Sequence, residues 1–226
     1  MAAMNEVEKL QRHRRQALFD RWAADYDRAV ASSSGEFPFD GYEDVLSTVV
    51  ALADVTPGIT VLDLGTGTGN LAASFVEQGC VVWGQDFSAA MIEQARAKAP
   101  GVHLVRADLR GEWPAELPAR FDRIVSAYVL HEFDLATKVA LLGRLAHQHL
   151  AMGGRIVVGD IAFPVQLARE VASRRWASLW DGDEYYWAAD EALGAFEAAG
   201  LAMDYRQVSS CGGVFTVWLP VAAQAG

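Results

Sequence analysis

The chain has 226 residues, of which 52% are hydrophobic and 21% are charged; this composition fits one globular domain with a sizeable core. Asp and Glu (29) outnumber Lys and Arg (19), and the net charge of −10 argues against nucleic acid as a partner because phosphate backbones are anionic. The sequence has no apolar signal-peptide core near its start and no apolar run as long as a membrane span. We therefore expect a cytoplasmic protein with no membrane partner, in which Cys80 and Cys211 are reduced.

The first half of the chain changes from helices to alternating strands and helices. Apolar residues at three- and four-residue steps predict a helix over residues 5–30, and a second helix is expected over 42–52. Strands are predicted at 61–64, 80–85, 102–105, 121–126 and 155–159, with helices from residue 70, at 89–99 and at 135–150. This alternation predicts an α/β fold with a Rossmann-like, mostly parallel sheet and helices on both of its faces.

The C-terminal part has a different pattern. Residues 164–187 are rich in aromatic side chains and are predicted to be helical, and a further helix is expected over 190–199. Two strands, 201–208 and 214–219, follow with a short Gly-containing linker between them, so they should be antiparallel neighbours. The sheet should therefore have seven strands, with the last one antiparallel.

A glycine-rich stretch between the first strand and its helix is the clearest motif. Gly65, Gly67 and Gly69 follow the strand and stand next to Asp63, and Asp86 ends the next strand 21 residues after Gly65. Glycine permits a tight turn and close approach of a ligand to the main chain. In open α/β sheets a ligand lies beyond the carboxyl ends of the strands. An acidic residue about 20 residues after the glycine-rich turn there accepts hydrogen bonds from ribose hydroxyls. The motif thus predicts a nucleoside-binding site.

This motif resembles the nucleoside-binding loop of class I S-adenosylmethionine (SAM)-dependent methyltransferases. The dinucleotide fingerprint would need a third glycine at position 70, where the chain has Asn70. An NAD-dependent oxidoreductase is therefore the less favoured alternative. A protein that binds SAM or S-adenosylhomocysteine (SAH) without catalysis, and an aminopropyl transferase of the same fold, also stay open. The resemblance implies SAM as the cofactor and SAH as its product.

The resemblance also implies the residues that hold the cofactor. Asp63 would serve the cationic amino group of SAM, Asp86 its ribose and Asp108 its adenine amino group. A turn-capping role for Asp63, a helix-capping role for Asp86 and a core role for Met91 are the alternatives. The full set of expected cofactor residues is Tyr26, Asp63, Gly65, Thr66, Gly67, Gly69, Asp86, Phe87, Met91, Asp108, Leu109 and Ser126.

The segment after the fourth strand should face the methyl acceptor. It has neither the Asn/Asp-Pro-Pro-aromatic motif of base amino methylation nor a Pro-Cys nucleophile. The segment from Ser126 to Phe133 instead resembles that of small-molecule methyltransferases. His131 is the first candidate for a general base, because imidazole titrates near working pH, and Tyr128 is a second candidate. A histidine that shapes the pocket without moving a proton is an equal alternative, and Glu132 is a weaker candidate base.

The resemblance extends over most of the chain, to a group of small bacterial methyltransferases. It implies a single domain, 1–226, divided into a helical lid (1–53), a SAM-binding core (54–163), an aromatic helical cap (164–189) and a C-terminal helix with a strand pair (190–226). The expected partner is a small-molecule acceptor. No metal is expected, and the oligomeric state, monomer or homodimer, is left open.

Overall fold

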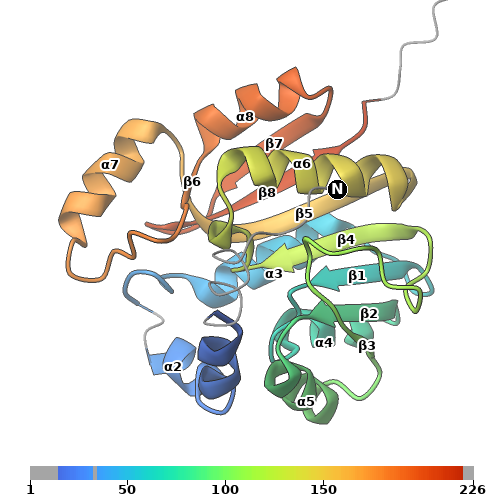
Figure 1. Cartoon of the computed structure of the whole chain (residues 1–226). Coiled ribbons are helices and arrows are strands. Elements are labelled where there is room, and N and C mark those ends of the chain that lie inside the picture. Colours follow the sequence, from blue (N-terminus) through green and yellow to red (C-terminus); the bar gives the residue numbers. More distant parts are fainter. Residues whose placement is uncertain (1–14, 33–34, 221–226) are drawn as a thin grey trace, which may run out of the picture.

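A twisted, mostly parallel sheet forms the centre of the protein (Figure 1). The structure is a computed structural model that describes residues 15–32 and 35–220. In this part of the chain the main sheet has the strand order β3-β2-β1-β4-β5-β8-β7. The strands are β1 (Thr60–Leu64), β2 (Val81–Asp86), β3 (His103–Arg106), β4 (Phe121–Ala127), β5 (Leu150–Phe163), β7 (Ala202–Gln207) and β8 (Gly212–Trp218).

The pairing of the strands confirms the predicted fold class. Neighbours from β3 to β5 are parallel, whereas β8 is antiparallel to both β5 and β7. The short strand β6 (Trp187–Ala188) adds a parallel pairing to the end of β5. The order of the strands reverses between β1 and β4, so the carboxyl ends of these two strands form the edge at which ligands bind in such sheets.

Helices cover both faces of the sheet. They are α2 (Tyr26–Ser32), α3 (Tyr42–Ala53), α4 (Asn70–Glu77), α5 (Ala89–Lys98), α6 (Leu135–Gln148), α7 (Gln166–Arg175) and α8 (Ala189–Ala198), with a 3₁₀ turn, η1 (Leu130–Glu132), after β4. None of the described helices is both long and apolar enough to cross a membrane.

Alternation along the strands produces two hydrophobic cores. Val61 and Val157 point to the core beneath α3 and α4, while Leu62 and Val158 point to the core beneath α6 and α8. Because successive side chains of a strand point to opposite faces, a parallel strand covered on both faces reads as a continuous apolar run. The run of apolar residues in β5 therefore follows from its central position between β4 and β8.

Two predicted helices differ from the structure. The helix predicted over 5–30 is interrupted: residues 15–22 are helical, 23–25 form a turn and α2 follows, while residues 5–14 lie outside the described part. The helix predicted over 164–187 ends with α7 at Arg175. The backbone N–H of Asp183 donates to the Asp181 carboxylate at 2.8 Å, a local bond that favours a turn over a helix. The ring of Phe37 stacks on Trp176 and holds this irregular segment against the core.

Contact between α3 and β5 leaves no room for a side chain at Gly159. A Cβ atom there would lie 2.6 Å from Val45 Cγ1 and 2.8 Å from Val49 Cγ2. Both valines are fully buried, so they can give way only by moving the helix. This contact sets how closely α3 approaches the sheet beside the ligand-binding edge.

Replacing Gly159 with alanine should destabilise the protein. Overpacking of this kind costs about 1–3 kcal/mol, and the melting temperature should fall by about 2–4 °C for each kcal/mol in a chain of this size. The matched control is Gly194→Ala in α8, where a Cβ would meet nothing within 4 Å and alanine should stabilise the helix. Equal melting temperatures of the two variants in a calorimetric scan would contradict this account of the α3–β5 contact.

Candidate active site

The turn between β1 and α4 depends on glycine at defined points. Gly65 has φ +65°, and a Cβ there would lie 2.5 Å from the Val129 side chain. Gly67 has φ +54°, and a Cβ there would meet only the Gly65 carbonyl oxygen, at 3.9 Å. The first glycine thus permits close packing against the loop after β4, and the second leaves backbone open to a ligand.

A cavity opens over this turn, at the carboxyl ends of the parallel strands. It contains about 1020 Å³ of space, part of which is open solvent at its mouth. The candidate catalytic residue Tyr128 lines it. So do ten of the predicted cofactor residues, which are Tyr26, Asp63, Gly65, Thr66, Gly67, Asp86, Phe87, Met91, Asp108 and Leu109.

Three predicted site residues lie outside the lining of this cavity. Gly69 is the N-cap of α4, where a Cβ would lie 3.2 Å from the Ala95 Cα and disturb the packing of α5. Ser126 is fully buried, and its hydroxyl donates to the Leu64 carbonyl at 2.9 Å, between β4 and β1. His131 stands beside the cavity, next to Glu132, which does line it. The structure thus gives Gly69 and Ser126 structural contacts in place of contacts with the cavity.

Asp86 fixes the far side of the glycine turn. Its carboxylate accepts hydrogen bonds from the backbone N–H of Gly67 at 2.9 Å and of Ser88 at 2.8 Å. Burial raises the pKa of Asp86, while these N–H bonds oppose the rise. The carboxylate therefore lies on the cavity wall with its position set by two backbone donors, and it retains acceptor capacity for a ligand.

Asp63 is a buried carboxyl at the base of the cavity. Only 1% of the residue is exposed, and the Thr66 hydroxyl donates to its Oδ2 at 2.7 Å. Burial, with the neighbouring Asp86 charge, raises the pKa of Asp63 to about 7. None of the interactions that shift it comes from a cation of the described residues. A positively charged ligand group here would therefore stabilise the carboxylate.

The N-terminal segment closes one side of the cavity. The Asp27 carboxylate accepts bonds from the Thr68 hydroxyl at 2.7 Å, the Asn70 amide at 3.1 Å and the Lys98 ammonium. Burial opposes ionisation of Asp27, but these donors outweigh it and lower its pKa. The contact joins α2 to the start of α4 and the end of α5, directly above the glycine turn.

Tyr128 is a strained residue directly after β4, on the cavity wall. Its φ of +55° is unusual for a residue with a side chain, and its ring stacks on Tyr42 with 5.0 Å between centroids. The buried hydroxyl has no hydrogen-bond partner among the described residues, and burial raises its pKa far above the ordinary value of tyrosine. Tyr128 therefore serves the site as a neutral phenol, and strain of this kind gathers at functional sites.

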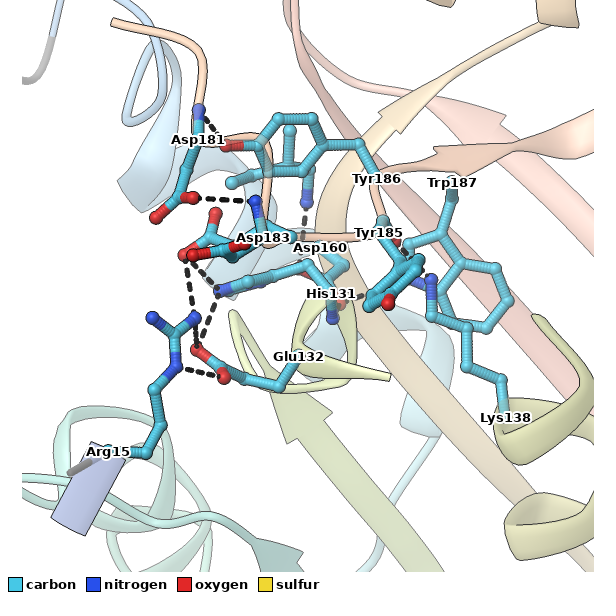
Figure 2. Close-up of polar contacts among 12 residues, drawn as sticks. Arg15, His131, Glu132, Lys138, Asp160, Asp181, Asp183, Tyr185, Tyr186 and Trp187 are labelled. Carbon is cyan, nitrogen blue, oxygen red and sulfur yellow. Dashed lines mark hydrogen bonds and ion pairs between the residues drawn. The ribbon is translucent and has the colours of Figure 1, made fainter. Parts of the chain in front are cut away.

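His131 is held by Asp160, a residue that sequence reasoning did not select (Figure 2). The imidazole Nδ1 lies 2.7 Å from Asp160 Oδ1, and the His131 backbone N–H donates to Oδ2 at 2.9 Å. Burial alone would lower the pKa of His131, but the charge of Asp160 and its hydrogen bond, with help from Glu184 and Glu132, raise it to about 9. The histidine is therefore protonated at neutral pH. A carboxylic residue directly after the apolar run of β5 was the available signal for Asp160.

Glu132 and Glu184 lie near the other nitrogen of His131, and Arg15 contacts both carboxylates. Figure 2 shows Arg15, Glu132 and His131 side by side. Arg15 Nε and Nη2 each lie 2.5 Å from an oxygen of Glu132, and Nη2 lies 3.3 Å from Glu184 Oε1. The donor atoms of His131, Glu132 and Glu184 lie within 4.8 Å of one another, which is a spacing that could hold a metal ion. In this structure the guanidinium of Arg15 contacts the carboxylates of both Glu132 and Glu184. That the protein binds no metal stays a prediction.

Comparison with known proteins identifies the family of this site. The model of a methyltransferase domain family matches residues 61–154. An uncharacterised methyltransferase of Geobacillus sp. (strain WCH70) is 34% identical over 200 residues, which cover 84% of this chain and 91% of that protein.

Solved structures agree with this comparison at the level of the fold. The complex of DhpI with SAH has a TM-score of 0.66 at 18% identity, covering 91% of this chain and 96% of that one. Magnesium protoporphyrin IX methyltransferase from Synechocystis PCC 6803, with bound SAH, has a TM-score of 0.60 at 19% identity, covering 97% of this chain and 90% of that one. With its glycine turn, acidic cavity and close relatives, the chain belongs to the class I SAM-dependent methyltransferase family.

Proposed function

We propose that the protein transfers the methyl group of SAM to a small-molecule acceptor. The observation that supports this most directly is one continuous cavity. Its floor carries Gly67 and Asp86 on the nucleoside side, and its wall carries Tyr128 and Glu132 on the other. Residues of the segment 15–32 also line this cavity. A cavity lined both by the glycine turn and by the loop after β4 suits a cofactor and a small acceptor held side by side.

The residues present fit SAM as the cofactor. The missing side chain at Gly67 leaves main chain open to the cavity, and Asp86 presents a carboxylate for ribose hydroxyls. Asp63 has no cationic partner among residues 15–32 and 35–220, and the amino group of SAM would supply one. When bound, SAM supplies a methyl group already activated by its sulfonium charge. The protein's own contribution is alignment and exclusion of water, for which positioning can supply roughly 7–11 kcal/mol.

His131 is the group that we assign to proton transfer. Asp160 fixes the ring and leaves Nε2 directed toward Glu132 and Glu184 at the edge of the cavity. With a pKa of about 9, the imidazole can accept a proton from an acceptor only as the pH approaches that value. Below it, the imidazolium holds a positive charge beside the two glutamates.

We further propose that the N-terminal residues up to 53 act as the lid and residues 164–189 as the cap.

The first experiment is isothermal titration of the protein with SAM, SAH and NADH. We expect SAM and SAH to bind and NADH not to bind. Asp86→Ala should lower the affinity for SAH by at least about tenfold, because a loss of about 1.4 kcal/mol of binding free energy is a factor of ten. The matched control is Asp122→Ala, which removes a carboxylate bonded to Thr60 at the opposite end of β1 and should leave the affinity unchanged. Tight NADH binding without SAH binding would refute the proposed function.

The stability of the protein without ligand should fall as Asp63 ionises. The pKa of about 7 in the folded protein lies above the usual 3.8, so burial of the carboxylate costs stability that grows between pH 3.8 and 7. Asp63→Asn should therefore melt at least about 3 °C above the wild type at pH 8, with little difference at pH 4. A simpler control is Asp122→Asn: the pKa of Asp122 is lowered, so this variant should be destabilised at pH 8.

The imidazole of His131 should titrate near pH 9 in an NMR experiment. Because its folded pKa lies above the usual 6.5, its pairing with Asp160 stabilises the fold fully below pH 6.5 and is lost as the pH rises through 9. His131→Gln assigns the signal. His149, whose pKa is lowered by burial, is the internal control and should titrate below 6.5. A midpoint of His131 near 6.5 would show that Asp160 does not set its charge.

A further inference from the structure

Arg15 occupies a site built from side chains of distant parts of the chain. It reaches from the helical segment 15–22 to Glu132 in η1 (Figure 2). It also reaches Glu184 in residues 164–189, the cap. Two donors face the two oxygens of Glu132 at 2.5 Å each, the paired geometry of a guanidinium with a carboxylate. The contact to Glu184 is a single, longer one at 3.3 Å.

The imidazole of His131 completes the site. Its side chain is nine-tenths buried, and Nε2 lies 3.8 Å from Glu184 Oε1 and 4.0 Å from Glu132 Oε1. Both separations are too long for a hydrogen bond. The planar guanidinium of Arg15, and not the imidazole, thus makes the hydrogen bonds to the two carboxylates.

The carboxylates around Arg15 outnumber its charge. Asp160 faces two cations, His131 and Lys138, whereas Glu132, Glu184 and the nearby charge of Asp181 face the single guanidinium of Arg15. Asp181 and Asp183 add further acid to the same segment of the cap. A site of this kind attracts cations and disfavours an anionic group.

The position of Arg15 connects this site to the cofactor cavity. Arg15 and Glu132 both line the cavity, together with the apolar side chains of Phe19 and Phe133. A molecule whose positive group took the place of the guanidinium would therefore extend past these rings toward the glycine turn. An acceptor held in this way would have a cationic end and an apolar body.

We propose that the methyl acceptor carries a cationic nitrogen, an ammonium or guanidinium group, which replaces Arg15 between Glu132 and Glu184. This inference rests on the proposed function. Arg15 then contacts Glu132 and Glu184 whenever no acceptor is bound. An organic cation fits the site better than a divalent metal, because the paired contacts to Glu132 are those of a planar donor group.

Binding of small probes to the complex with SAH tests the proposal. The probes share one ring and differ in charge: benzylamine and benzylguanidine are cations, benzyl alcohol is neutral and phenylacetate is an anion. The cations should bind Arg15→Met about tenfold more tightly than the wild type, because the competing guanidinium is gone. Glu184→Gln in the Arg15→Met background should remove this gain, whereas Asp183→Asn, an exposed acid of the same segment, should retain it.

Each other outcome contradicts the proposal in a distinguishable way. Equal or tighter binding of benzyl alcohol or phenylacetate would overturn the cationic acceptor while SAH binding left the proposed function intact. Tight binding of Mn²⁺ that is lost in Glu184→Gln, with no preference for the organic cations, would make the site a metal centre. Failure of the wild type to bind SAH in the same titrations would overturn both the proposed function and this inference.

Discussion

A single buried carboxylate orders the acceptor side of this protein. Asp160 is fully buried at the end of β5 and accepts hydrogen bonds from the backbone and ring of His131, from the Trp187 indole and from its own neighbour Ile161. An isolated charge in that position would cost several kcal/mol. Because four donors offset this cost, η1, the end of β5 and the start of β6 are held in one arrangement.

The two sides of the cavity are held in place by different interactions. On the cofactor side, main-chain groups of the glycine turn and the fixed carboxylate of Asp86 present a pre-formed surface. On the side of His131, ionised side chains from four distant segments meet, so the geometry depends on charge as well as on packing. Changes in pH should therefore affect the acceptor side between neutrality and pH 9, where His131 loses its proton.

Much of the fold could be predicted from local patterns. The alternation of apolar runs and helices indicated the parallel sheet, and the spacing from Gly65 to Asp86 indicated the ligand-binding edge, because both depend on residues close in sequence. The interruption of the first helix and the early end of α7 were missed, since long-range aromatic contacts such as Phe37 on Trp176 compete there with helical periodicity.

The site could be predicted only in part for the same reason. Cofactor residues follow the ends of successive strands, so fold and motif together locate them. A carboxylic residue in the apolar sequence of β5 marks Asp160 as unusual, but the approach of Asp160 and Glu184 to His131 depends on the whole sheet and cap, which no local pattern indicates. Ser126 is the last residue of the expected strand 121–126, but β4 continues to Ala127 and the Ser126 hydroxyl donates to the Leu64 carbonyl inside the sheet.

The place of β8 in the sheet has a consequence for synthesis on the ribosome. β8 lies between β5 and β7 and is the last strand of the described chain. Until residue 218 has been made, one edge of β5 lacks its partner, and an unpaired, apolar edge is prone to pair with other chains. The strands β1 to β4 can assemble earlier, as N-terminal parts do during translation. The nascent protein therefore carries an unpaired, apolar strand edge from the completion of β5 at residue 163 until β8 has been made.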